Sequence, residues 1–434
     1  MTKITVNIIL LFSVYLFCGL ICSYYNTLIY ELPDIFYDTD INYHYNLLYM
    51  EKGSISLDRH PFTFIVAFVL KTISFFIPSP KLVLLFCQAV VATFNNISLF
   101  VILRRIKIRL SSSVFFTMIY AFSFSTLFFV SFPEVYLYSS CIGLLLTYFI
   151  LPDSVLFGKS LSEQTRTLVV AFLCVCGFGI NTVNIVLYIP LLIYYFSEIS
   201  QTQRKFCIFT FFFSFMLLFS VFVIIGEFVC HLSGMLFSDM SLSWVKLDFS
   251  LTRAVKVFQE TFIAPFYALD TDLILKKGAY GWYFTDIQNP LYFIPFLLLM
   301  VFADFRKHRE KTPYIIYACA GVVILHAFMN YFYNITWFLY SQNYLFLFIV
   351  FMAYLYSETN AKKQAFILSA FLIFQILLNF KMLYVFAVWL NGSVIPLIPD
   401  AVAKVAFADL VIIGISVLCH IIAHKSGERL NENV

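Results

Sequence analysis

The sequence predicts an all-α polytopic membrane protein with about twelve transmembrane helices, in a range of roughly ten to thirteen. Two observations predict this class. Hydrophobic residues make up 62% of the 434 residues and charged residues only 12%, whereas soluble proteins carry about a quarter charged residues. Apolar runs of about 17 to 25 residues, the length that crosses a bilayer, recur along the whole chain. The composition excludes a soluble globular protein, and we treat residues 1–434 as a single transmembrane domain.

The first element is the apolar run from Ile8 to Cys22. We expect it to remain as an uncleaved helix, because no small-x-small cleavage site precedes the next loop and many spans follow. The crossings are expected at residues 6–26, 82–103, 110–131, 134–151, 167–181, 183–197, 206–226, 289–303, 312–330, 340–356, 365–388 and 405–423.

The run 62–78 is expected to be a re-entrant or interfacial helix that does not cross the membrane. If it crossed, every later loop would change sides and the clusters Arg104 to Arg109 and Arg306 to Lys311 would face outward. Short cytoplasmic loops carry the excess of Lys and Arg, so this orientation is rejected. The loops expected on the cytoplasmic side also hold Lys159, Arg166, Arg204, Lys205, Lys362, Lys363, Lys425 and Arg429.

Acidic residues collect on the opposite, outward side under this assignment, in two long segments at residues 27–81 and 227–289. The second segment has the irregular polarity of helices that lie along a membrane surface. Loops of this length inside a compact protein usually carry function. We therefore expect any chemistry to face away from the cytoplasm.

The first outward segment contains Asp38, Asp40 and His44 among aromatic residues. Two carboxylates so close together can hold a metal ion, bind sugar hydroxyls, or leave one of them as a general base. A helix beginning at Asp40 would place His44 on the same face, while helix capping by Asp38 or Asp40 is the structural alternative. No cofactor follows with certainty, and a divalent metal on these three residues stays open.

Arg59, His60 and Pro61 open the run 62–78. A proline in a first helical turn with a cation before it suits a helix that enters the membrane. Functionally, Arg59 would offer its planar fork to a phosphate and His60 a further donor.

Glu134 follows a proline between two expected crossings, at the same membrane depth as the first outward segment. It is either a favourable partner of a helix dipole or part of a site. Polar residues between Gly177 and Asn184 interrupt the fifth and sixth crossings at their outer ends, where they line a cavity or turn the chain.

Arg253, Lys276 and Lys277 are basic residues on the outward side, against the orientation rule. They either extend to lipid headgroups or form a clamp for a lipid phosphate. His326 lies inside the ninth crossing, where a packed residue at a helix interface is expected.

The order of these features resembles the GT-C superfamily of integral-membrane glycosyltransferases. The features are an uncleaved first helix, an outward loop with an acidic triplet, a basic-His-Pro start of a hydrophobic run, a next helix ending in Arg-Arg, and an outward Pro-Glu. Protein O-mannosyltransferases and the bacterial aminoarabinose transferase are the most similar branch. The resemblance covers residues 1–200, and the C-terminal half is similar only in helix count and general plan.

The resemblance implies transfer of a sugar, with inversion, from a polyprenyl-phosphate carrier to an acceptor on the outer face. Asp40 or Asp38 would be the base or orient the acceptor, Arg59 and His60 would lie beside the donor, and Glu134 would be the second acidic residue. The sequence departs from the family in its single proline after His60, its small second loop, and the absence of a large C-terminal soluble domain. Lipid, glycan and protein acceptors therefore all stay open.

Independently of the resemblance, an acceptor hydroxyl needs a nearby carboxylate, and a lipid-phosphate leaving group needs cations. The partners expected are the lipid-linked donor, the acceptor and membrane lipids, without nucleic acid, in a bacterial inner (plasma) membrane. The alternative function is a flippase, transporter or polymerase of lipid-linked saccharides. A transporter should carry charges or broken helices at mid-membrane in two related halves, whereas here the polar residues gather at one face. A structural membrane protein without activity is a third alternative.

Overall fold

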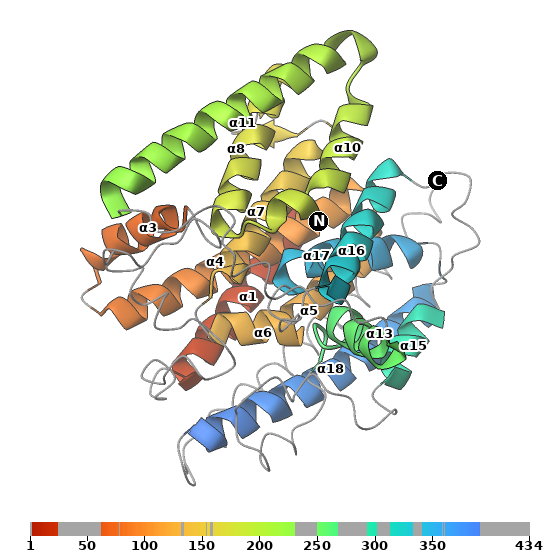
Figure 1. Cartoon of the computed structure of the whole chain (residues 1–434). Helices are drawn as coiled ribbons and strands as arrows, with labels where there is room; N and C mark the ends of the chain where they lie inside the picture. Colours follow the sequence, from red (N-terminus) through yellow and green to blue (C-terminus); the bar gives the residue numbers. More distant parts are fainter. Residues whose placement is uncertain are drawn as a thin grey trace.

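The computed structural model describes most of the expected crossings as α-helices (Figure 1). The described residues are 2–24, 62–77, 79–131, 134–152, 154–156, 159–230, 250–267, 293–301, 313–332, 341–357, 359 and 361–390. In chain order the first helices are α1 Thr2–Tyr24, α3 Phe64–Ser74, α4 Pro80–Arg105, α5 Leu110–Ala121, α6 Phe124–Ser131 and α7 Tyr136–Ile150. They are followed by α8 Glu163–Ile180, α9 Asn184–Leu187, α10 Ile189–Glu198, α11 Gln201–Cys230, α13 Leu251–Phe258, η2 Gln259–Ile263, α15 Phe293–Val301, α16 Tyr314–Phe332, α17 Leu345–Leu355 and α18 Ala361–Leu390.

A two-residue strand pair, β1 Val155–Leu156 with β2 Lys159–Ser160, forms an antiparallel turn between α7 and α8. Within the described residues, five helices are long and apolar enough to cross a membrane, or six if the bent pair α5 and α6 is one span. These helices are compatible with a multi-pass membrane protein. The number of twelve crossings stays a prediction.

One end of the helices gathers basic side chains. Arg105, at the end of α4, donates hydrogen bonds to the carbonyl oxygens of Tyr148 and Pro152, at the end of α7. Arg166, in the first turn of α8, donates to the carbonyl oxygen of Leu151 and lies over the ring of Tyr195 in α10. We call this the basic end.

The helices α4, α7 and α10 therefore end at the basic end, whereas α8 begins there and runs antiparallel to them. Arg204, at the start of α11, donates to the carbonyl oxygens of Ser197 and Ile199 and so belongs to the same end. The structure thus brings together basic residues from separate loops that were all expected on the cytoplasmic side. Glu134 lies before the N-terminus of α7, at the opposite end, which we call the Glu134 end.

The helix α3 has only 11 residues. It is about 16 Å long at 1.5 Å per residue, whereas the hydrocarbon core of a bilayer is about 30 Å thick. Its buried residues pack on both sides, Phe64 and Ala67 against α8 and α11, and Leu70 against α4. The helix α17, in an expected crossing, also has 11 residues, so the length of α3 does not decide whether the run 62–78 crosses, and its re-entrant course stays a prediction.

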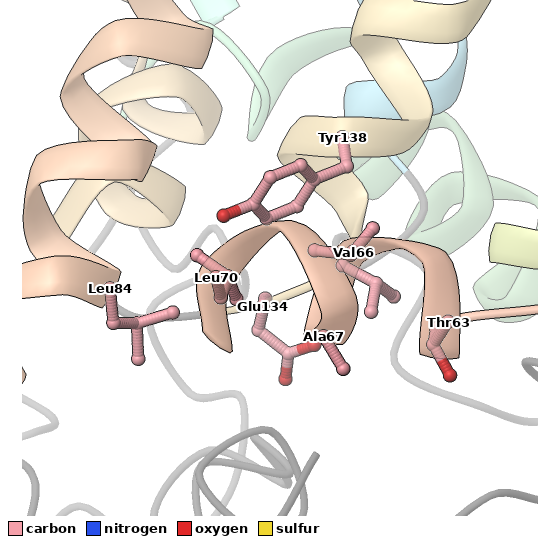
Figure 2. A pocket seen from close by; sticks show the side chains of 8 residues that line it. Thr63, Val66, Ala67, Leu70, Leu84, Glu134 and Tyr138 are labelled. Atoms are coloured by element: carbon pink, nitrogen blue, oxygen red, sulfur yellow. The ribbon is translucent and has the colours of Figure 1, made fainter. Parts of the chain in front are cut away.

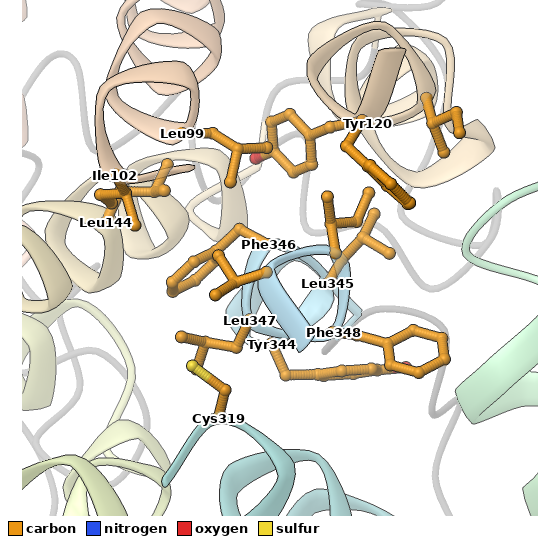
Figure 3. Packing of buried hydrophobic residues seen from close by; sticks show 14 of the residues in the cluster. Leu99, Ile102, Tyr120, Leu144, Cys319, Tyr344, Leu345, Phe346, Leu347 and Phe348 are labelled. Carbon is orange, nitrogen blue, oxygen red and sulfur yellow. The ribbon is translucent and has the colours of Figure 1, made fainter. Parts of the chain in front are cut away.

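The core of the described part is centred on α17, whose side chains are almost all buried. Figure 3 shows α17 surrounded by residues of other helices, among them Leu99 and Ile102 of α4, Leu144 of α7 and Cys319 of α16. Figure 1 shows the long helices α11 and α18 on opposite sides of the molecule, away from this centre.

The pair α5 and α6 bends by 49° at its break. The backbone N–H groups of Phe124 and Ser125 leave the helix ladder there and donate to the carbonyl oxygens of Phe266 and Pro265, each at 3.0 Å. Asn379 of α18 donates to the carbonyl oxygens of Phe122 and Phe266, at 2.7 and 2.8 Å. Segment 259–267 and Asn379 therefore supply hydrogen-bond partners to the broken helix.

This arrangement differs from the sequence-based expectation for the second outward segment. That segment was expected along the membrane surface, but its described part 250–267 ends inside the bundle, with Ile263, Ala264 and Phe266 buried. A polar cluster adjoins the same break. Gln342, ahead of α17, is hydrogen-bonded to Tyr120 at 3.1 Å and to Ser125 at 2.8 Å. Polar residues therefore occupy the middle of the bundle as well as one end.

Candidate functional site

A small cavity at the Glu134 end is the candidate site. Its volume is ≈ 20 Å³, and its wall contains residues of α3, α4 and the start of α7. Figure 2 shows the lining side chains gathered around the α3 ribbon, with Leu84 reaching toward them from α4. The lining residues are Thr63, Val66, Ala67, Leu70, Leu84, Glu134, Val135 and Tyr138. The wall is thus mostly apolar, with three polar side chains.

Glu134 is the carboxylate of this cavity. Only 3% of the residue is exposed, and it stands two positions before the first residue of α7. The N-terminus of a helix carries partial positive charge, which favours a carboxylate there by about 0.3 to 1 kcal/mol. This gain is smaller than the cost of burying a charged group in apolar surroundings. The dipole interpretation alone therefore does not account for the burial of Glu134.

Tyr138, in the first turn of α7, lines the same cavity as Glu134. Its hydroxyl oxygen is buried and has no hydrogen-bond partner among the described residues. Figure 2 shows this hydroxyl above α3, on the side of Leu70 and Leu84. Tyr138 was not among the predicted site residues, although it follows Glu134 by only four positions.

The start of α3 is fixed against the C-terminal end of α8. The backbone N–H of Phe62 donates to the carbonyl oxygen of Gly179 at 2.8 Å, and the Phe62 ring is completely buried. A Cβ atom at Gly179 would lie 2.2 Å from the Phe62 ring, so only glycine permits this approach. Thr63, the next residue, lines the cavity. The contact between Phe62 and Gly179 therefore positions one wall of the site.

The polar turn between α8 and α9 belongs to the same end. Asn184 donates through Nδ2 to the Ser139 hydroxyl at 2.7 Å and to the carbonyl oxygen of Gly177 at 2.9 Å. Ser139 is the neighbour of Tyr138 on α7. Asn184 thus joins the N-terminal end of α7 to the C-terminal end of α8, and it supports the helix that carries Tyr138.

Arg253 lies at a different place, against the C-terminal end of α16. Its Nε donates to the carbonyl oxygen of Tyr331 at 2.7 Å, and its guanidinium lies 5.9 Å from the centre of the Tyr331 ring. Lys256 and Glu260, one turn further on, form an ion pair at 3.7 Å. A role for Arg253 in holding a lipid phosphate stays a prediction.

His326 is buried and packs against the ring of Tyr344, with ring centres 3.9 Å apart. This agrees with the expectation of a packed residue at a helix interface.

Several predicted site residues lie outside the described residues: Asp38, Asp40, His44, Arg59, His60, Lys276 and Lys277. Within the part of the chain that the structure describes, no three His, Cys, Asp or Glu residues are grouped as a metal site. The metal predicted on Asp38, Asp40 and His44 is therefore not tested.

Comparison with protein-family models, with curated proteins and with solved structures finds no match to this chain.

Proposed function

We propose that the protein is a GT-C-like glycosyltransferase, which transfers a sugar from a polyprenyl-phosphate donor to an acceptor with inversion. One observation carries this proposal. A buried carboxylate, Glu134, lines a cavity at the end of the helices opposite the basic end, and the short helix α3 forms one wall of that cavity. Under the orientation rule the basic end is cytoplasmic, so the cavity would face outward, toward a lipid-linked donor.

The site supports the chemistry as follows. The oxygen of an acceptor hydroxyl forms a bond to the anomeric carbon while the bond from that carbon to the phosphate oxygen breaks. The hydroxyl proton passes to a carboxylate, Asp40 or Glu134, and the polyprenyl phosphate leaves with the electron pair of the broken bond. An inverting displacement requires this base and the leaving group on opposite faces of the sugar.

The chain also supports a cationic group near the cavity. Arg59 and His60 precede Phe62 by three and two residues. Covalent connection alone therefore keeps the Cα of Arg59 within roughly 11 Å of the Cα of Phe62, whose neighbour Thr63 lines the cavity. A guanidinium that reaches the cavity would suit the developing negative charge on the leaving phosphate.

A flippase, transporter or polymerase of lipid-linked saccharides is the second candidate. The break between α5 and α6, with polar residues beside it, is a feature that transporters place around their substrate sites. Here Asn379 and the carbonyl oxygens of segment 259–267 bond to the broken backbone. Because the freed groups at the break already have protein partners, it is better explained as packing than as a substrate site.

A transfer assay tests the proposal. Purified protein is incubated with a panel of radiolabelled polyprenyl-phosphate sugars and lipid, glycan and peptide acceptors, and free polyprenyl phosphate is measured. We expect the wild-type protein to release polyprenyl phosphate. In Asp40→Asn or Glu134→Gln the rate of release should fall about 10²- to 10⁴-fold, the usual contribution of a general base. Glu227→Gln is the matched control, since Glu227 is an exposed carboxylate at the same end.

The outcomes separate the candidates. Release that depends on Glu134 but not on Glu227 supports a transferase. If Asp40→Asn and Glu134→Gln both release polyprenyl phosphate at the wild-type rate, the assignment of the base is wrong. If wild type releases nothing from any donor, and lipid-linked saccharide crosses a vesicle bilayer that holds the protein, the transporter is correct.

A further inference from the structure

The Tyr138 hydroxyl is a buried polar group without a hydrogen-bond partner among the described residues. Buried Tyr hydroxyls normally find a partner, because an unmade bond leaves the desolvation cost uncompensated. The Tyr120 hydroxyl, for example, is hydrogen-bonded to Ser140 at 2.8 Å and to Gln342 at 3.1 Å. The Tyr188 hydroxyl also lacks a partner in the described part of the chain, but Tyr138 differs from it in lining the cavity of Glu134. At a cavity wall such a hydroxyl is placed to bond a group that enters the cavity.

The size of the cavity restricts that partner. A volume of ≈ 20 Å³ admits a group about as large as one water molecule, and a sugar ring is far larger. The remaining wall is mostly apolar, with Val66, Ala67, Leu70 and Leu84. The entering group is therefore small: either a water molecule or a single polar function at the end of a larger molecule that stays outside.

A hydroxyl group matches Glu134 and Tyr138, two of the three polar side chains in the wall. It has one proton to donate and two lone pairs that accept. An ionised carboxylate only accepts, so Glu134 suits the proton, whereas the Tyr138 O–H can donate to one lone pair. The second lone pair is then free to attack the anomeric carbon.

We propose that this cavity is the subsite for the attacking hydroxyl of the acceptor, and that Tyr138 is its second protein ligand. This inference rests on the proposed function, because it names the substrate group that enters the cavity. A bound water would satisfy the same two side chains, and the experiment below separates the two sources. If the cavity holds a water molecule, the Tyr138 hydroxyl has a structural role. If it receives the acceptor hydroxyl, Tyr138 has a role in binding the acceptor.

The test compares Tyr138→Phe with Tyr120→Phe and wild type. Thermal unfolding in detergent without substrate is measured first. Tyr120→Phe removes two hydrogen bonds of the resting protein and should lower Tm. Tyr138→Phe removes none and should leave Tm unchanged or raise it, since a buried orphan hydroxyl is replaced by hydrogen.

Kinetics are measured next in the transfer assay, with glycerol as the hydroxyl probe and then with each panel acceptor that wild type uses. We expect kcat/KM for the acceptor to fall roughly tenfold in Tyr138→Phe, which corresponds to one hydrogen bond, while the KM for the donor stays unchanged.

Three outcomes would count against the acceptor subsite or the proposed function. A fall in Tm as large as that of Tyr120→Phe overturns the inference, because the cavity then holds a structural water. Wild-type acceptor kinetics in Tyr138→Phe overturn it as well, while the proposed function stands. If wild type transfers to no acceptor, the proposed function fails and the acceptor subsite fails with it.

Discussion

Replacing Gly179 by alanine should displace the start of α3. The added Cβ would lie 2.2 Å from the Phe62 ring and 2.4 Å from its Cβ. Carbon atoms in contact are normally about 3.5 to 4 Å apart, so the two backbones would have to separate by more than about 1 Å. A shorter side chain at position 62 cannot relieve this contact, since every residue except glycine has a Cβ.

The loss in the free energy of unfolding has two contributions. Overpacking of a filled core costs typically about 1 to 3 kcal/mol. The hydrogen bond from Phe62 to Gly179, now 2.8 Å, would lengthen beyond about 3.5 Å and lose about 1 kcal/mol more. We expect a loss of about 2 to 4 kcal/mol in the free energy of unfolding, and lower transferase activity because Thr63 moves with Phe62.

The assay is thermal unfolding in detergent together with the transfer rate. Gly321→Ala is the matched control, because Gly321 is also helical but its Cβ would meet Pro190 at 3.2 Å, a contact that small shifts relieve. The gain in helix propensity is the same for both variants and cancels in the comparison. If Gly179→Ala unfolds at the same temperature as Gly321→Ala and keeps full activity, the close approach of α3 to α8 does not position the site.

Further predictions concern the break and the orientation of the helices. Asn379→Leu should lower the free energy of unfolding by about 1 to 3 kcal/mol, and Tm with it, because the carbonyl oxygen of Phe122 at the break loses a buried donor. An unchanged Tm would mean that the break needs no side-chain support. A cysteine replacing Glu227, exposed at the Glu134 end, should react with a membrane-impermeant maleimide added to intact cells. A cysteine replacing Gln164, exposed at the basic end, should react only after the cells are opened. If in intact cells this cysteine reacts and the one at position 227 does not, the predicted orientation of the helices in the membrane is reversed.

Much of the fold was predictable because hydropathy and charge are local properties. The crossing expected at 134–151 corresponds to α7, and the one expected at 206–226 lies within α11. The run 62–78 was predicted not to cross from charge distribution alone, and its described helix α3 has 11 residues; the re-entrant course stays a prediction. The sequence also placed Glu134 and the polar turn before Asn184 at the same end.

Segment 250–267 shows where such reasoning stops. Its charges predicted a surface position, yet Arg253 is buried and bonded to the end of α16, and Phe266 lies inside the bundle. Hydropathy measures the side chains of a segment and not the hydrogen bonds of its backbone. The carbonyl oxygen of Phe266 is held inside because the broken helix at Phe124, over 100 positions away in the chain, needs an acceptor.

By itself the sequence determined the all-α class, the apolar lengths, the separation of basic from acidic loops, and Glu134 as an isolated carboxylate between two spans. The tertiary structure alone decided that Phe62 meets Gly179, that Tyr138 shares a cavity with Glu134, and that its hydroxyl has no partner among the described residues. The physical reason is that a cavity and an unmade hydrogen bond depend on how closely distant segments approach. Such distances, at the scale of one methyl group, follow from the packing of several helices at once and are not encoded in any one of them.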